Sequence, residues 1–336
     1  MPVPFIVAGI AIASAITGGV AAAKGYKKVS KARDTNESAN EIVEKARKKI
    51  EKRSSKAVGI MDEIGKEELN ALKSFEKFAD LVEKIQNRPE FSDISNDGLK
   101  LEEFSLDELK DAAVGATAVI SAISSAATGA FAGIAASGAT TGLMSMGLSY
   151  GGIAATNHVL ATIGGGALAA GGGGVALGTT LLSAATAGIG ILVGGCIFNF
   201  TGNKVLEKAE ENYDMALEIK DKAKNICKHL KQLTEVAETF FNTFTKVRSH
   251  YNNCLDALSF IIAKHCKGQE KCDYSSFSQD ERVIFKNLVL LVRVLFEMCK
   301  VKIVLQKEEQ EEMHEVNTQE VMSIVQKAKE TVQSIS

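Results

Sequence analysis

Between Ala112 and Asn203 the sequence contains no Asp, Glu, Lys or Arg, although 24% of the whole chain is charged. This uncharged block is built mainly from Gly, Ala, Ser, Thr and Leu. A helix that crosses a bilayer needs about 20 apolar residues, so the block has room for two to four membrane-length passes. We therefore expect this part of the chain to enter a lipid bilayer.

Glycine pairs inside the uncharged block are separated by four residues, which places both members of a pair on one face of a helix. In lipid, such faces let helix backbones approach closely and associate. These pairs are therefore the candidate residues for membrane insertion and helix packing. They are Gly129 and Gly133, Gly138 and Gly142, Gly147 and Gly151, Gly174 and Gly178, and Gly190 and Gly194.

A water-soluble Gly/Ala-rich helical core is the alternative interpretation of the block. Each glycine in a helix interior costs up to about 1 kcal/mol relative to alanine, so such a core would forgo on the order of 10 kcal/mol, comparable to the stability of a whole domain. This disfavours the soluble core. The alternative stays open because tight helix packing recovers part of the loss.

The membrane passes differ in strength. The segment from Val175 to Phe200 holds eleven strongly apolar residues, which favour insertion by roughly 3 to 7 kcal/mol before polar offsets. The segment from Ala112 to Ala136 is marginal and needs a partner helix. His158 is the one residue of the block that titrates near neutrality, and a pH trigger at this position is a minor alternative to a solvated turn.

The flanking sequences predict an all-α fold. Proline occurs only at Pro2, Pro4 and Pro89, so long helices are permitted almost everywhere. A narrow apolar stripe predicts one helix over 29–88, and the acidic stretch after residue 305 continues a second helix that starts near residue 280. Another long helix carries apolar residues on a seven-residue register, interrupted by Lys220, Thr234 and Arg248. This seam consists of Leu206, Ala209, Tyr213, Ala216, Ala223, Cys227, Leu230, Ala237, Phe241, Phe244, Tyr251, Leu255, Leu258 and Ile262.

These helices must bury their stripes against one another, which predicts a long antiparallel bundle or coiled coil with the Gly/Ala-rich block as a hydrophobic helical-hairpin head. We divide the chain into an apolar segment with a basic flank (1–28), a long amphipathic helix and loop (29–110), the membrane-inserting region (111–203) and a helical hairpin (204–336). The first segment is consistent with a signal peptide, a membrane helix or a core helix.

The sequence offers little for catalysis. Glycine runs at 164–166 and 171–174 lack the lysine and the preceding strand of a phosphate-binding loop, so no cofactor is expected. His250, Cys254, His265, Cys266 and Cys272 match no zinc spacing, so no metal is expected. The scattered cysteines are read as mostly reduced, with a Cys266–Cys272 disulfide as a minority alternative. A net charge of -2 gives no case for nucleic-acid binding.

The glycine-rich sequence resembles that of a known group of proteins. The run GGGALAAGGGGVALG at 164–178, followed by ILVGG at 191–195 and CIFNFTG at 196–202, resembles uncharacterised bacterial glycine-zipper helical membrane proteins. More distantly, the layout resembles cytolysin A-type α-pore-forming toxins and apolipoprotein L. The resemblance implies insertion, oligomerisation and permeabilisation, and it assigns no catalytic residue.

We therefore expect a non-enzymatic membrane-inserting protein that oligomerises through its glycine-zipper hairpins and forms pores. The alternative is a constitutive membrane scaffold or tether whose helical bundle binds a protein partner. In both cases the partner is a lipid bilayer, and a homo-oligomer is expected. The expected location is a membrane, either the bacterial inner membrane or one reached from the cytoplasm, with secretion left open.

Overall fold

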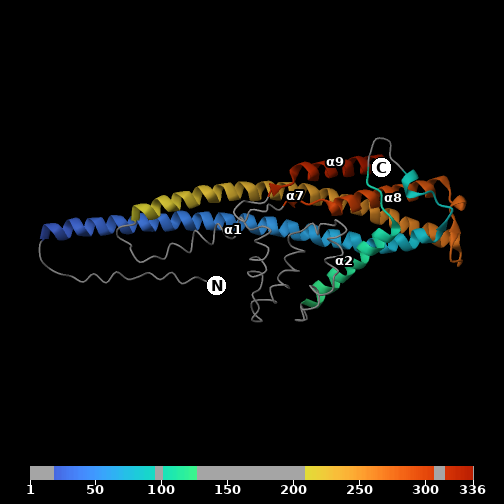
Figure 1. The fold of residues 1–336 in the computed structure, drawn as a ribbon, viewed down its shortest axis with the longest axis horizontal. Helices are drawn as coiled ribbons and strands as arrows, with labels where there is room; N and C mark the ends of the chain where they lie inside the picture. The colour runs from blue at the N-terminus through green and yellow to red at the C-terminus, as the bar shows by residue number, and fades with distance from the viewer. Residues whose placement is uncertain (1–18, 95–100, 127–208, 306–314, 336) are drawn as a thin grey trace.

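The computed structural model describes residues 19–94, 101–126, 209–305 and 315–335, and these residues are predominantly helical (Figure 1). The predicted all-α class is confirmed for them. The helices are α1 (Gly19–Glu83), α2 (Leu106–Ala126), α7 (Ala209–Cys266), α8 (Gln279–Lys300) and α9 (Thr318–Ile335), with short 3-10 helices at Phe91–Asp93 and Tyr274–Ser276. Four two-residue strands are β1 (Ile85–Gln86), β2 (Cys272–Asp273), β3 (Val304–Leu305) and β4 (Glu315–Val316).

Helices α1 and α7 lie side by side and run in the same direction (Figure 1). Lys56 pairs with Glu238 at 2.8 Å, and further along both helices Lys77 pairs with Asp256 at 2.8 Å. Beyond them, β1 pairs with β2 in parallel register. The antiparallel arrangement predicted for these two helices is therefore wrong. A short connection forces neighbouring helices to be antiparallel, and no short connection joins α1 to α7.

We call the pair of α1 and α7 the rod. Its longer helix, α1, has 65 residues and is therefore about 98 Å long at 1.5 Å per residue. Helix α8 runs back along α7, since Lys264 near the end of α7 pairs with Glu281 near the start of α8 at 2.9 Å. Helix α9 packs against both α7 and α8. The described helices thus form a two-helix stem that thickens at one end, where α2, α8 and α9 also pack.

One row of the predicted seam of α7 is confirmed, and the second row is displaced. The confirmed row is buried against α1 and consists of Ala216, Ala223, Leu230, Ala237, Phe244, Tyr251 and Leu258. The sequence predicted a second buried row, made of the residues four positions after each member of the first. In that predicted row, however, Lys220 is exposed and Cys227 is only half-buried. The observed second row is instead made of the residues three positions after each member of the first. It consists of Ile219, Ile226, Leu233, Phe240, Val247, Cys254 and Ile261, of which Ile219 and Cys254 are half-buried.

The two rows, three residues apart, lie on one side of α7, the side that packs along α1. Thr234, which interrupts the predicted row, is buried and satisfies its hydroxyl by donating to the Leu230 carbonyl at 2.7 Å. Towards the thick end, Leu255 and Ile262 of the predicted row are also buried, because α8 and α9 cover that side of α7. The apolar stripe predicted for α1 is confirmed, with Ala46, Ile50 and Ile64 among its buried members.

The single helix predicted after residue 280 is wrong, because it is split into α8 and α9. Helix α8 begins at a capping box, in which Ser278 and Glu281 satisfy each other's backbone N–H groups. It ends at Lys300, where buried Val301 turns to extended backbone. Strands β3 and β4 then pair antiparallel, and the Asn317 side chain donates to the Lys302 carbonyl at 2.9 Å. The β-branched run around Val301 favours this extended connection over a continuous helix.

Helix α1 ends at Glu83, five residues before the predicted end at Arg88. Ile85 and Gln86 form β1, and Asn87 adopts a left-handed backbone with φ of 56°. At its other end α1 already includes Gly19, so it runs continuously through residue 28. Ser105 caps α2 as predicted, since its hydroxyl accepts from the Glu108 N–H at 3.1 Å.

Candidate functional site

The five glycine pairs predicted to insert into a membrane, from Gly129 to Gly194, lie outside the described residues, as does His158. The described residue nearest to them in the chain is Ala126, at the end of α2. Among the residues that the structure describes, no helix is both long and apolar enough to cross a bilayer. The described part of the candidate site is therefore α2, which leads into the uncharged block.

Helix α2 changes character along its length. Its charged residues, Asp107, Glu108, Lys110 and Asp111, occupy the first two turns, and none follows. Leu109, Ala112, Ala113 and Ala116 are fully buried. Val114 on the opposite side is 66% exposed. In Figure 1 the later turns of α2 point away from the rod, so an uncharged helix end projects from a charged stem.

Ion pairs fasten the first turns of α2 to the thick end of the rod. Lys110 pairs with Glu83 of α1 at 2.6 Å, which raises the pKa of the Lys110 amine. Lys300 at the end of α8 lies 3.0 Å from Glu102 and 3.7 Å from Glu108. These pairs are at least partly exposed and contribute little stability individually, but they fix where α2 begins.

A buried arginine holds the segment between α1 and α2. The Arg293 guanidinium of α8 donates to the Ile94 carbonyl at 2.8 Å and to the Phe91 carbonyl, and burial lowers its pKa. The Phe91 ring packs on Phe104 at 4.8 Å between centroids, and both contact Phe78 of α1. These contacts of Arg293 could not be predicted from the sequence, because a lone arginine in an apolar helix shows no pairing pattern.

At the turn between α7 and α8, a serine, a histidine and a glutamate form a chain of hydrogen bonds. The Ser276 hydroxyl lies 3.1 Å from His265 Nδ1, and His265 Nε2 lies 2.9 Å from a Glu281 oxygen. This order resembles a nucleophile, a base and an orienting acid. The Ser276 hydroxyl, however, is also held 2.6 Å from the Asp273 carbonyl. Glu281 in turn accepts from Lys264 and from the Ser278 N–H, so we interpret the network as a fastening of the turn.

The thiols of Cys266 and Cys272 are both buried at this turn and are not bonded to each other. The disulfide considered from the sequence is therefore wrong. Burial, with the neighbouring Cys266 thiol, raises the pKa of Cys272 to about 12, and its thiol donates to the Lys84 carbonyl at 3.7 Å. A thiol held protonated is a poor nucleophile and a poor metal ligand. Within the described ranges, no three His, Cys, Asp or Glu side chains are placed to hold a metal ion.

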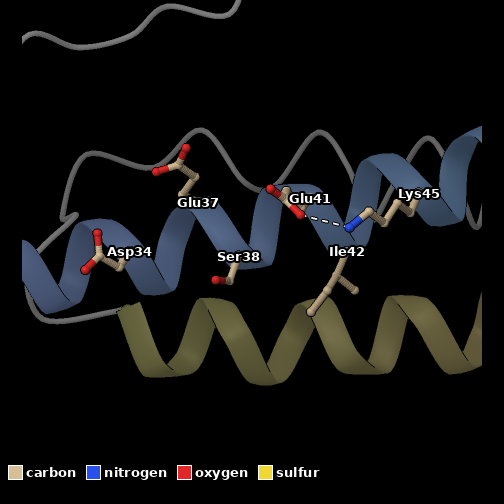
Figure 2. Close-up of a pocket in the computed structure, with 6 residues that line it drawn as sticks. All are labelled: Asp34, Glu37, Ser38, Glu41, Ile42 and Lys45. Atoms are coloured by element: carbon tan, nitrogen blue, oxygen red, sulfur yellow. Dashed lines mark hydrogen bonds and ion pairs between the residues drawn. The ribbon is translucent and has the colours of Figure 1, made fainter.

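A shallow surface pocket of about 370 Å³ lies on the thin part of the rod (Figure 2). Its lining comes entirely from α1. Figure 2 shows Ile42 pointing toward the neighbouring helix, whereas Glu37 and Glu41 point away from it. Glu41 is paired with Lys45 at 2.8 Å, which lowers the pKa of this carboxyl. Because the pocket lies outside the bundle and these charges face solvent, it does not resemble an enclosed catalytic site. It is lined by Asp34, Glu37, Ser38, Glu41, Ile42 and Lys45.

The Glu281 network predicts an acid-sensitive contribution to stability. The hydrogen bond from Lys264, followed by that from the Ser278 backbone, lowers the pKa of Glu281 from 4.5 to about 2. A lowered pKa stabilises the fold above pH 4.5, and the contribution is lost as the pH falls from about 4.5 to 2. Because solvent screens the exposed Lys264, we expect Glu281→Gln to cost on the order of 2 kcal/mol at pH 7 and much less near pH 2.

Urea unfolding of both proteins at several pH values measures this difference. Asp280→Asn is the matched control, since Asp280 is exposed and adjacent in the first turn of α8. The control is expected to change stability by less than about 0.5 kcal/mol at any pH. A cost for Glu281→Gln that stays constant down to pH 2 would contradict the assignment.

No protein-family model, no curated protein and no solved structure matches this chain. The resemblance to glycine-zipper membrane proteins and to α-pore-forming toxins therefore stays an expectation.

Proposed function

We propose that this protein is a helical rod that delivers its uncharged glycine-rich block into a lipid bilayer, where the block oligomerises and permeabilises the membrane. The observation that carries the proposal is α2. It begins in a cluster of ion pairs on the rod, loses all charge after Asp111, and projects away from the rod with Val114 exposed. The chain then continues without charge to Asn203.

An uncharged helix end on a charged rod has a physical consequence. In water, the exposed apolar side of α2 is unfavourable, while in hydrocarbon the same side needs no polar partner. The first turns of α2 hold Glu108, Lys110 and Asp111, which must stay at the aqueous boundary. The later turns of α2 can thus enter the bilayer as an uncharged segment, which we call the proposed entrance, while the charged first turns stay in water.

No catalytic role enters the proposal. The Ser276, His265 and Glu281 network fastens a turn, and the pocket on α1 is open to solvent. A membrane scaffold that binds a protein partner is the second candidate function. Phe260 favours it, because this large apolar side chain of α7 is 77% exposed.

Dye release from liposomes tests the proposal. The native chain, added to vesicles without detergent, is expected to release the dye. Val114→Lys places a charge on the exposed side of the uncharged helix, three residues beyond Asp111, where snorkelling to the nearby aqueous boundary limits the cost to about 1 kcal/mol. We therefore expect dye release to slow by roughly fivefold, with little change in the stability of the rod.

Val283→Lys is the matched control, because Val283 is 48% exposed on α8 and lies outside the proposed entrance. It is expected to release dye at the native rate. Equal rates for Val114→Lys and the native chain would refute insertion through α2. A chain that needs detergent for extraction and never releases dye would instead support the scaffold.

A further inference from the structure

Four lysines of α1 lie on one side of that helix. Lys45, Lys49, Lys52 and Lys56 follow one another at steps of four, three and four residues, which keeps them on a single stripe of an α-helix. All four are exposed. The stripe lies beside the core positions Ala46, Ile50 and Ala57 and belongs to the thin part of the rod.

Helix α7 carries a second stripe of the same kind. Lys220, Lys224, Lys228 and Lys231 follow at steps of four, four and three residues, and all are exposed. Lys220 interrupts the seam predicted from the sequence, and its exposure shows that the position faces outward. The second stripe therefore also flanks the contact between the two helices.

The two stripes border the same side of the rod. Glu238 lies seven residues after Lys231, so it continues the α7 stripe two turns further along. The partner of Glu238 is Lys56, the last member of the α1 stripe, at 2.8 Å. Because α1 and α7 are parallel, the stripes run alongside each other. The eight lysines of the two stripes form what we call the lysine face, which extends over roughly 27 Å of the rod.

Among the side chains that the structure describes, few acidic groups neutralise the lysine face. Lys45, Lys56 and Lys231 pair with Glu41, Glu238 and Glu235. Each of these pairs is largely exposed and therefore weak. The remaining five lysines make no ion pair with another described residue, and they leave an excess of positive charge on this side. They are Lys49, Lys52, Lys220, Lys224 and Lys228.

We propose that the lysine face binds the anionic headgroups of a lipid bilayer and lays the rod against the membrane surface. This rests on the proposed function, because the uncharged block of the same chain is the part that enters the bilayer. Clusters of lysine beside a membrane-inserting segment are attracted to anionic lipid. Lysine also suits a headgroup surface, since its long stem reaches while its ammonium group stays hydrated.

A nucleic acid fits the lysine face less well. Proteins that hold single strands stack the bases on aromatic rings, and no Phe, Tyr or Trp occurs between Lys45 and Lys56 or between Lys220 and Lys231. Arginine, which binds phosphate with two parallel hydrogen bonds, contributes none of the eight residues. A lipid surface requires neither stacking nor bidentate contacts.

Sedimentation of the full chain with vesicles tests the proposal. The vesicles contain phosphatidylcholine with about 30 mol% phosphatidylserine, or phosphatidylcholine alone. The test variant carries Lys49→Gln, Lys52→Gln, Lys224→Gln and Lys228→Gln. Each lysine near an anionic surface is expected to contribute several-fold to partitioning, so the variant should bind anionic vesicles on the order of 100-fold more weakly. Binding of the native chain should weaken similarly in about 1 M salt.

The matched control carries the same change in net charge away from the lysine face. It combines Lys73→Gln, Lys246→Gln, Lys286→Gln and Lys329→Gln, all at exposed positions. The control is expected to bind anionic vesicles within about threefold of the native chain. Equal losses in the two variants, or no loss in the test variant, would overturn the proposal. Tighter binding of the native chain to duplex DNA than to anionic vesicles would also overturn it.

This experiment separates the lysine face from the proposed function. Val114→Lys, which should release dye more slowly, is expected to keep salt-sensitive binding to anionic vesicles. If the native chain also fails to release dye while this binding persists, the insertion proposal fails and the lysine face remains. If dye release persists and the test variant binds as the native chain does, only the lysine face fails.

Discussion

Replacing Phe75 with alanine is expected to destabilise the protein by about 3 to 5 kcal/mol, the range found when a buried phenylalanine leaves a cavity. Phe75 lies on α1 and is fully buried. Its ring meets Tyr251 of α7 edge to face at 5.9 Å and Phe296 of α8 at 6.1 Å. One side chain thus joins three helices, and its neighbours cannot all close into the space that it leaves.

Urea unfolding followed by circular dichroism measures this loss. Phe260→Ala is the matched control, because it removes the same ring from a position that is 77% exposed. We expect the control to change the free energy of unfolding by less than about 0.5 kcal/mol. Similar losses in the two variants would show that the three-helix contact does not hold the thick end together.

The double variant Gly174→Leu and Gly178→Leu is expected to abolish oligomer formation in lipid and, with it, dye release. Leucine at both positions covers the bare helix face through which the proposed hairpins approach, and in lipid no hydrophobic effect compensates for the lost packing. Leucine also makes the segment more apolar, so a loss of dye release cannot be attributed to weaker partitioning into the bilayer. We expect release to fall at least tenfold.

Chemical cross-linking in liposomes, read together with dye release, measures both effects. Gly59→Leu is the matched control, because Gly59 is an exposed helical glycine of α1 and an added Cβ there meets nothing within 4 Å. The control should cross-link and release dye as the native chain does. Unchanged dye release from the double variant would count against assembly through glycine faces.

The sequence predicted what depends on local periodicity. The scarcity of proline and the apolar stripes predicted the helical class, the long helix over α1 and the first row of α7. The position predicted for the second buried row of α7 was wrong, because steps of three and of four residues both continue a helical stripe. Leu255 and Ile262, which are apolar and buried, favoured the step of four. Only the direction from which α1 approaches α7 decides between them.

Features that depend on distant contacts could not be predicted. Nothing in the sequence indicates that α1 and α7 are parallel, since a segment as long as residues 84–208 permits either direction. In the sequence, Arg293 is a single charged residue within an apolar helix. Only the structure shows that it donates hydrogen bonds to the carbonyls of Phe91 and Ile94. The two lysine stripes are visible in the sequence, yet they become one surface only through the Lys56–Glu238 pair.

Since α1 and α7 share one direction, the chain that leaves α1 at Glu83 has to travel back before α7 can start. Judged from the level of Lys56 and Glu238, Ala209 and Glu83 are separated by about 56 residues of helix, or roughly 84 Å. Even a fully stretched backbone needs about 25 residues for that journey. A shortened version of this protein with a tight loop in place of residues 84–208 would therefore have to reverse α7, and every pairing along the stem would change.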